Sequence, residues 1–241
     1  FGDWRLQNKF ETMGWAGRMG NTAWEYLMVV NTNVSGAKSD RAIEQEIDHK
    51  AELQADGTII NTLKITRTHT AKKGDKFTGV KNLDWMRIYV PLGSQFLEAE
   101  GFWPPDESLF EEPGDDWIRD EDLEAENNFS RDRKSWTKIY NEDNKTIFAN
   151  WVQVDPGQSV EVTIKYVLPF SLVSLNNDAV PYALYAQIQP GAKPSDLVSR
   201  LVLTDGLRPD WHYPDTLNTG VYGWFVETSL ESDKFFAVTV K

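Results

Sequence analysis

Hydrophobic and polar residues alternate along much of the chain, most clearly over residues 43–55. The apolar residues of this stretch share one parity: Ile43, Ile47, Ala51, Leu53 and Ala55. The charged residues hold the other parity: Glu44, Glu46, Asp48, Lys50 and Glu52. Because neighbouring side chains of a strand point to opposite faces, this pattern predicts a strand with one buried face and one wet face.

A return strand follows directly. Asp56-Gly57 is a pair that accepts the positive φ angles of a tight hairpin turn. After it, the buried parity continues at Ile59, Leu63 and Ile65. We therefore predict a β-hairpin in which Glu44, Glu46 and Glu52 face water and the following residues are buried: Ile47, Leu53, Ile59, Leu63 and Ile65. A shift of one residue would invert every side chain.

Short strand signals recur through the rest of the chain, separated by turn-forming Gly, Pro and Asn residues. This pattern favours a mainly β fold, which we predict to be an antiparallel β-sandwich of Ig-like type with a short N-terminal helix. For the helix, Asp3 can cap the first turn, and Leu6 and Phe10 share one face. We interpret residues 1–22 as the helical remnant of a preceding domain, and residues 23–241 as one β-sandwich or two smaller ones.

The charge of the chain is concentrated in one segment. Residues 98–132 contain fourteen acidic and two basic residues, whereas the rest of the chain contains 23 of each. This acidic insertion does not alternate, which predicts a long loop between strands. Four of its carboxylates are spaced so that a loop can fold around a calcium ion: Asp115, Asp116, Asp120 and Asp122. The alternative is a loop that is only solvated, because no calcium-loop motif is present and charge runs usually face water.

The amino-acid composition excludes several kinds of sites and partners. The chain has no cysteine, which excludes disulfides, thiolate zinc sites and cysteine nucleophiles, and no other cofactor than calcium is predicted. A net charge of −12 argues against a nucleic-acid partner. No apolar run reaches the roughly 20 residues of a membrane-spanning helix, so we do not expect this part to cross a membrane. The first residue is Phe1, so we expect that an export signal or anchor lies upstream.

Residues 29–40 read Val-Val-Asn-Thr-Asn-Val-Ser-Gly-Ala-Lys-Ser-Asp. This stretch resembles a signature of the uncharacterised bacterial family known as domain of unknown function 4012, and residues 87–94 and 187–191 also match. The resemblance covers residues 4–191 in scattered blocks and concerns the C-terminal, β-rich part of such proteins. It implies an extracellular or cell-surface protein of bacteria, anchored by a membrane segment that this chain lacks. The acidic insertion departs from the family pattern, which leaves its role open.

The polar residues of this stretch form the candidate binding site: Asn31, Asn33, Lys38, Ser39 and Asp40. One interpretation is a polar surface site. The other is turn chemistry, because Asn and Asp side chains bond nearby backbone groups and Lys38 can pair with Asp40. No catalytic residue is predicted, since the three histidines have no metal-site spacing and no nucleophile or phosphate-loop motif occurs.

The ten tryptophans suggest sugar binding, because their rings stack on the apolar faces of sugars. Trp85, Trp136, Trp151 and Trp224 lie in strand contexts that favour burial, while Trp103 and Trp117 lie in the acidic insertion and are better placed for exposure. We therefore expect a non-enzymatic structural or adhesive interaction module whose partner is a cell-envelope component or another surface protein. The alternative is a domain that binds or processes carbohydrate, with a polysaccharide partner.

Overall fold

The computed structural model describes residues 2–13, 16–34, 37–111, 114–118, 128–172, 179–204 and 206–241. Its helical elements are α1 (Trp4–Thr12), η1 (Ser39–Ala42) and η2 (Glu107–Leu109). Its strands are β1 (Glu25–Asn33), β2 (Ile43–Leu53), β3 (Thr58–His69), β4 (Asn82–Pro91), β5 (Gln95–Glu100), β6 (Ser130–Arg131), β7 (Lys138–Glu142), β8 (Lys145–Val154), β9 (Ser159–Ser171), β10 (Val180–Gln187), β11 (Ser195–Val202), β12 (Pro209–Tyr213), β13 (Asn218–Gly220), β14 (Gly223–Leu230) and β15 (Lys234–Val240). The mainly β prediction is confirmed.

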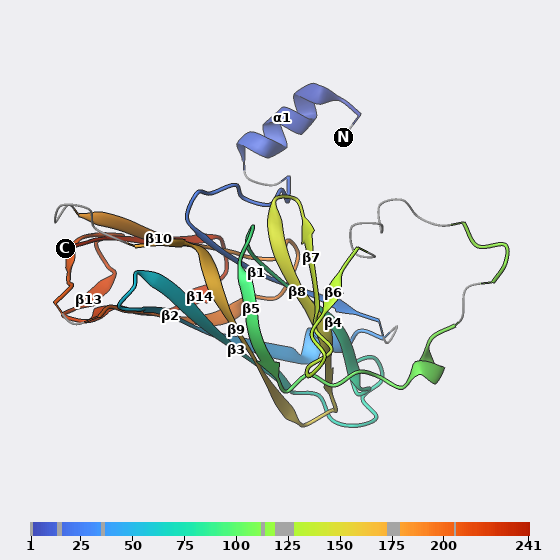
Figure 1. Ribbon diagram of the computed structural model, residues 1–241. Helices are drawn as coiled ribbons and strands as arrows, with labels where there is room; N and C mark the ends of the chain where they lie inside the picture. Colours follow the sequence, from blue (N-terminus) through green and yellow to red (C-terminus); the bar gives the residue numbers. More distant parts are fainter. Residues whose placement is uncertain are drawn as a thin grey trace.

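The strands form two sheets that face one another (Figure 1). The first sheet has the order β12-β15-β10-β1-β4-β8-β7-β6, and the second has the order β13-β14-β11-β2-β3-β9-β5. The prediction of a purely antiparallel arrangement is wrong, because β1 pairs with β10 and β2 pairs with β11 in parallel. The physical reason is that the chain changes sheets twice in the same sense, from β1 to β2 and again from β10 to β11.

The hairpin of β2 and β3 has the predicted register. Ile47 lies opposite Ile65, and Leu53 lies opposite Ile59. The five residues predicted to be buried are each at most 5% exposed. Glu44 and Glu46 are exposed, and the side chain of Glu52 keeps 35% of its surface in water. The alternation of apolar and charged residues therefore predicted both the pairing and the buried face.

The core lies between the two sheets and draws apolar side chains from both, including Leu27, Ile88 and Phe148 from the first and Ile65 and Ile164 from the second. A smaller apolar cluster covers the outer face of the first sheet and contains Tyr26, Tyr89 and Tyr140. The segment before β1 packs onto this outer face. Gly20 comes so close to it that an added Cβ would lie 2.2 Å from the Tyr185 ring. Only glycine fits this approach without displacing the ring.

The N-terminal helix begins as predicted, since the Asp3 side chain accepts hydrogen bonds from the backbone N–H groups of Arg5 and Leu6. None of the residues of α1 is buried, and the helix stands apart from the two sheets (Figure 1). Within the described ranges, no helix has the length and hydrophobicity needed to cross a bilayer.

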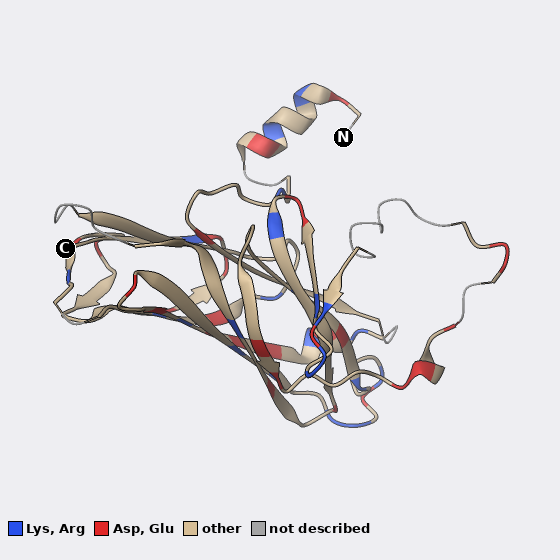
Figure 2. Ribbon diagram, viewed as in Figure 1, with Lys and Arg blue, Asp and Glu red and all other residues tan. Residues whose placement is uncertain are grey.

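The ends of the acidic insertion belong to the sheets, since residues 98–100 lie in β5 and residues 130 and 131 form β6. The segment that carries η2 extends away from the sheets (Figure 2). The acids of the insertion are partly paired: Glu98 lies 2.6 Å from the Lys165 ammonium, and Asp106 caps η2 by accepting from the Ser108 N–H. Trp103 and Trp117 are exposed, as predicted. The predicted burial of Trp136 is wrong. This residue lies in a turn with a φ of 62°, and its side chain is 60% exposed.

Candidate functional site

The two sheet-changing segments lie at the same end of the molecule. Residues 34–42 connect β1 to β2, and residues 188–194 connect β10 to β11. Because β1 runs parallel to β10 and β2 runs parallel to β11, both segments leave the first sheet at the same end. Between them lies a pocket of about 550 Å³, which is lined by β1, β2, β3 and the second connecting segment.

Strand pairing stops at this pocket. The backbone pairing of β1 with β10 ends at Met28 and Gln187. Beyond this point, the side chain of Gln189 bonds the backbone of β1. The Gln189 Oε1 accepts from the Asn31 backbone N–H at 2.9 Å, and its Nε2 donates to the Asn31 carbonyl at 3.1 Å. The side-chain amide thus makes the pair of bonds that a neighbouring strand would make.

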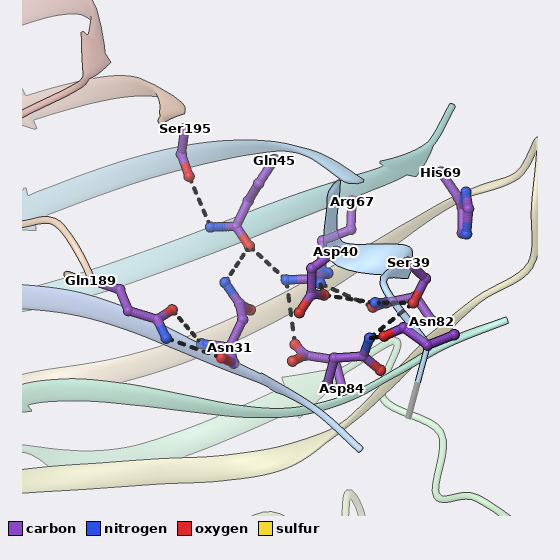
Figure 3. A network of polar contacts seen from close by, with 12 residues as sticks. Asn31, Ser39, Asp40, Gln45, Arg67, His69, Asn82, Asp84, Gln189 and Ser195 are labelled. Carbon is purple, nitrogen blue, oxygen red and sulfur yellow. Dashed lines mark hydrogen bonds and ion pairs between the residues drawn. The ribbon is translucent and has the colours of Figure 1, made fainter. Parts of the chain in front are cut away.

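Arg67 forms the centre of the polar wall (Figure 3). Its side chain is only 2% exposed, although it carries a permanent charge. Its Nη1 donates to Gln45 Oε1 and its Nη2 donates to Asn82 Oδ1, both at 3.0 Å. The same Gln45 oxygen accepts from Asn31 Nδ2 at 3.0 Å, so one amide joins β1, β2 and β3.

Two carboxylates compensate the Arg67 charge. Asp84 Oδ2 lies 3.3 Å from Nη1 and is fully buried, and Asp40 Oδ1 lies 3.7 Å from Nη2 and is half exposed. Burial raises the pKa of Asp84 to about 6, and the neighbouring Arg67 opposes this rise. The guanidinium therefore lies in a neutralised environment and not in an excess of positive charge.

Two buried polar atoms of the pocket wall remain unsatisfied. Asn31 Oδ1 and Arg67 Nε have no hydrogen-bond partner among the described residues. Both residues line the pocket. A buried polar atom without a partner costs about 1–3 kcal/mol, and most such atoms in proteins are paired. Both atoms have almost no solvent-accessible surface, so they lie inside the wall and are not exposed to the pocket.

The five predicted binding residues divide into two groups. Asn31 and Asp40 line the pocket, as the surface-site interpretation requires. Asn33 and Ser39 serve the turn, with Asn33 Nδ2 donating to Ser39 Oγ at 2.9 Å. Lys38 is exposed, and its backbone N–H donates to the Phe77 carbonyl. Residues 29–40 therefore contain both residues that line the pocket and residues that stabilise the turn.

The predicted calcium ligands are only partly within the described residues. Asp115 and Asp116 are described, and they belong to no group of three possible metal-ligating side chains in that part of the chain. Asp120 and Asp122 lie outside the described residues. Calcium binding stays a prediction.

Gln45 and Arg67 were missed as site residues, although the sequence contains a signal for both. They share the buried parity of the hairpin with Ile43, Ile47 and Ile65. A polar residue on a buried face needs partners, so its position marks a polar network or a site. Gln189 carried no comparable signal, because it follows a strand and contributes through one side-chain amide.

His49 also lies on the buried parity and belongs to a second network, deep in the core. Its Nε2 lies 2.7 Å from Glu25 Oε1, and its Nδ1 lies 3.0 Å from Ser199 Oγ. Asn61 and Tyr182 also donate to the Glu25 carboxylate. Burial, followed by the charge of Glu25, raises the pKa of Tyr182, which therefore stays a protonated donor.

Serine, histidine and an acid also occur together in hydrolytic triads. Here all three side chains are 0% exposed, and none of them lines the pocket. Glu25 and Tyr182 belong to the first sheet, and His49, Asn61 and Ser199 belong to the second. The network therefore joins the two sheets through buried hydrogen bonds.

No family model matches the chain, and no curated protein matches it. Among solved structures, a candidate nutrient-binding protein from Legionella pneumophila is 8% identical, with a TM-score of 0.38, 90% of this chain covered and 70% of the other. A two-domain M1 zinc metallopeptidase bound to L-tryptophan is also 8% identical, with a TM-score of 0.35 and coverage of 83% and 43%. Likenesses this weak carry no argument for function.

Proposed function

We propose that this chain is a non-enzymatic interaction module of a bacterial cell-surface protein, and that the pocket between its two sheet-changing segments is its binding site. The observation that supports this most strongly is the pocket itself, which has a volume of about 550 Å³ and combines an aliphatic wall with polar side chains. Ligand sites in proteins are commonly clefts of this size with apolar walls and a few polar groups.

The setting at the cell surface rests on the resemblance of residues 29–40 to the uncharacterised bacterial family. In this proposal the membrane anchor belongs to another part of the protein, and an Ig-like sandwich carries the pocket. The setting is tested by protease treatment of intact bacterial cells that express the full protein. We expect the module to be cleaved from intact cells, whereas cleavage only after lysis would place it inside the cell.

The pocket itself is tested by methyl NMR on isoleucine-labelled protein. Ile43 and Ile47 line the pocket, while Ile147 lies on the outer face of the first sheet and serves as an internal control. A library of small soluble sugars, peptides and carboxylic acids is added in separate pools. We expect at least one pool to shift the Ile43 and Ile47 signals and to leave Ile147 unchanged. If no pool shifts the two pocket signals selectively, the pocket is not a binding site.

Carbohydrate binding is a second candidate function, supported by a separate surface. Trp211 and Tyr213 lie two residues apart on β12 and therefore share a face, and they are 53% and 50% exposed. The Phe235 ring on the neighbouring strand lies 6.2 Å from that of Tyr213 and is 40% exposed. A row of exposed rings on a sheet offers stacking surfaces for sugars.

This candidate is tested by cosedimentation with chitin and with purified peptidoglycan. Trp211→Ala is compared with Trp117→Ala, which removes a ring of 60% exposure in the acidic insertion. Loss of cosedimentation in the first variant alone would support sugar binding at β12. Equal behaviour of both variants would remove this candidate.

A further inference from the structure

A second pocket, of about 280 Å³, lies at the other end of β1. The first pocket is lined by Asn31 near the end of β1, whereas the second is lined by Tyr26 near its start. The second pocket is framed by the segment that leads into β1, the turn after β4, the turn between β7 and β8, and the end of β9. Figure 1 shows the β7–β8 hairpin next to the segment before β1. Because Lys145, the first residue of β8, lines this cavity, we name it the lysine pocket.

Lys145 is buried without an anionic partner. Only 4% of its surface is exposed. Its ammonium forms neither an ion pair nor a hydrogen bond with any described residue. The ammonium lies over the Tyr26 ring, 4.5 Å from the ring centroid. Lysines are almost never fully buried unless they are paired, so Lys145 lacks a partner that a ligand can supply.

The Lys145 ammonium can be reached from the pocket. Buried polar atoms that lack a hydrogen-bond partner include Asn31 Oδ1 and Arg67 Nε, but Lys145 Nζ is not among them. Since Nζ also lacks a partner, it keeps solvent-accessible surface. The rest of Lys145 is buried, so this surface faces the lysine pocket that the residue lines. A ligand in this pocket therefore contacts the charge directly.

Hydrogen bonds fix the surroundings of the ammonium. The Tyr26 hydroxyl donates to Gln187 Oε1 at 2.7 Å, and the Gly20 N–H donates to the same oxygen at 2.8 Å. Gln187 Nε2 donates to the Arg18 carbonyl at 2.9 Å. Burial raises the pKa of Tyr26, so its ring stays a neutral phenol and does not neutralise Lys145. The site is therefore formed before any ligand binds.

The charges around Lys145 favour a ligand with a single negative charge. Burial lowers the pKa of Lys145, and the charge of Asp143 opposes this effect. Glu142 lies opposite Lys145 in the hairpin, and its carboxylate accepts a hydrogen bond from the Tyr89 hydroxyl at 3.3 Å. A monoanion pairs with the ammonium, whereas a dianion such as phosphate is repelled more strongly by these acids.

The rest of the lysine pocket combines apolar side chains with amides. Its largely apolar lining comes from Trp24, Pro91, Leu92, Pro169 and Phe170. Asn21 and Asn144 line it as well and are exposed, so their side-chain amides can donate hydrogen bonds to a ligand. An organic acid matches this lining, because its carboxylate accepts hydrogen bonds and its remaining carbon atoms suit the apolar groups.

From these observations we infer that the lysine pocket binds the carboxylate of a small organic acid. The carboxylate forms an ion pair with the Lys145 ammonium and accepts hydrogen bonds from the amides of Asn21 and Asn144. The apolar part of the acid contacts Leu92 and Phe170. The volume of about 280 Å³ restricts the ligand to a small molecule. This inference does not rest on the proposed function, because the two pockets lie at different ends of β1.

The test follows lysine side-chain signals by NMR in protein with isotope-labelled lysine. Propionate and benzoate are the probes, and propionamide is the neutral analogue of propionate. Phosphate and sodium chloride are added separately at matched ionic strength. Lys64 is the internal control, because its side chain is 45% exposed and its ammonium lies 3.3 Å from Glu161. We expect propionate or benzoate to shift the Lys145 signal saturably and to leave Lys64 unchanged. Propionamide and chloride should cause no such shift.

A matched pair of variants places the acid at Lys145. The acid with the larger effect is titrated by calorimetry into the wild type, Lys145→Met and Lys64→Met, and thermal melts establish that the variants fold. We expect Lys145→Met to weaken binding at least about tenfold, because hydrogen bonds to the charged ammonium are lost. Lys64→Met should bind like the wild type. The NMR titration of the wild type tests the inference even if Lys145→Met does not fold.

Several results would overturn the inference. Neither acid shifts the Lys145 signal saturably, or propionamide or chloride shifts it as much as the acids do. A saturable shift with phosphate alone would mean that the lysine pocket selects a dianion and not a carboxylate. Equal affinities of the wild type and Lys145→Met would place the bound acid elsewhere on the chain.

Discussion

Arg67 and Asp84 form an ion pair across the two sheets, with Nη1 and Oδ2 separated by 3.3 Å and side chains that are 2% and 0% exposed. Arg67 belongs to β3 of the second sheet, and Asp84 belongs to β4 of the first. Breaking a buried pair by removing one partner leaves an uncompensated charge. The pair therefore holds the polar wall of the pocket in place.

Asp84 makes stability depend on pH. Its folded pKa of about 6 is above the ordinary value of 3.8, because burial disfavours the charged form. Its contribution is fully present below the ordinary pKa and is lost as the pH rises through the folded pKa. Between about pH 4 and about pH 7, we expect the wild type to lose on the order of 3 kcal/mol relative to Asp84→Asn, which cannot titrate.

Urea unfolding of both proteins at the two pH values measures this difference. The variant keeps the size of the side chain, so titration of all other groups cancels in the comparison. If the unfolding free energies of the wild type and Asp84→Asn change equally across this pH range, the role given to Asp84 is wrong.

Leu63 tests the buried face of the hairpin. This residue is 1% exposed, and truncating a buried leucine costs about 2–5 kcal/mol. We expect this loss for Leu63→Ala in urea unfolding. The control is Leu97→Ala on β5, which is 49% exposed and should cost no more than about 0.5 kcal/mol. Similar losses for the two variants would mean that the register is wrong.

Glu25 and His49 should be strongly coupled, because both are fully buried and their side chains lie 2.7 Å apart. His49→Leu leaves Glu25 Oε1 without this hydrogen-bond partner in the buried core, and we expect a loss of about 1–3 kcal/mol. Adding Glu25→Gln replaces the carboxylate that His49 contacts, so the double variant should lose less than the sum of the single losses. A double-mutant cycle measures this coupling. Additive losses would show that the two side chains do not act as a pair.

Calcium binding by the acidic insertion is tested by thermal melts with millimolar calcium or with chelator, at matched ionic strength. If calcium is the counter-ion of the insertion, it raises the melting temperature, since a ligand at about 100 times its Kd stabilises the folded state by about 2.7 kcal/mol. Asp116→Asn combined with Asp120→Asn should abolish the rise. Equal melting temperatures with calcium and with chelator would mean that the insertion is only solvated.

The pattern of hydrophobic and polar residues predicted the local elements of the fold. The hairpin of residues 43–69 follows from parity and one Asp-Gly turn, and the capped helix follows from Asp3. The parallel pairing of β1 with β10 did not follow, because Glu25 and Leu184 carry no local signal of their contact. Site residues were predictable where they lie on a strand, as for Asn31. The pocket as a whole depends on chain segments that only the tertiary fold brings together.

The most direct test of the pocket as a binding site is a crystal structure of the chain with a compound from a pool that shifts the Ile43 and Ile47 signals. We predict that the compound lies in the pocket between β1 and β2, with an apolar part against Ile43 and Ile47. A compound bound at Trp211 and Tyr213, with the pocket empty, would contradict the proposal.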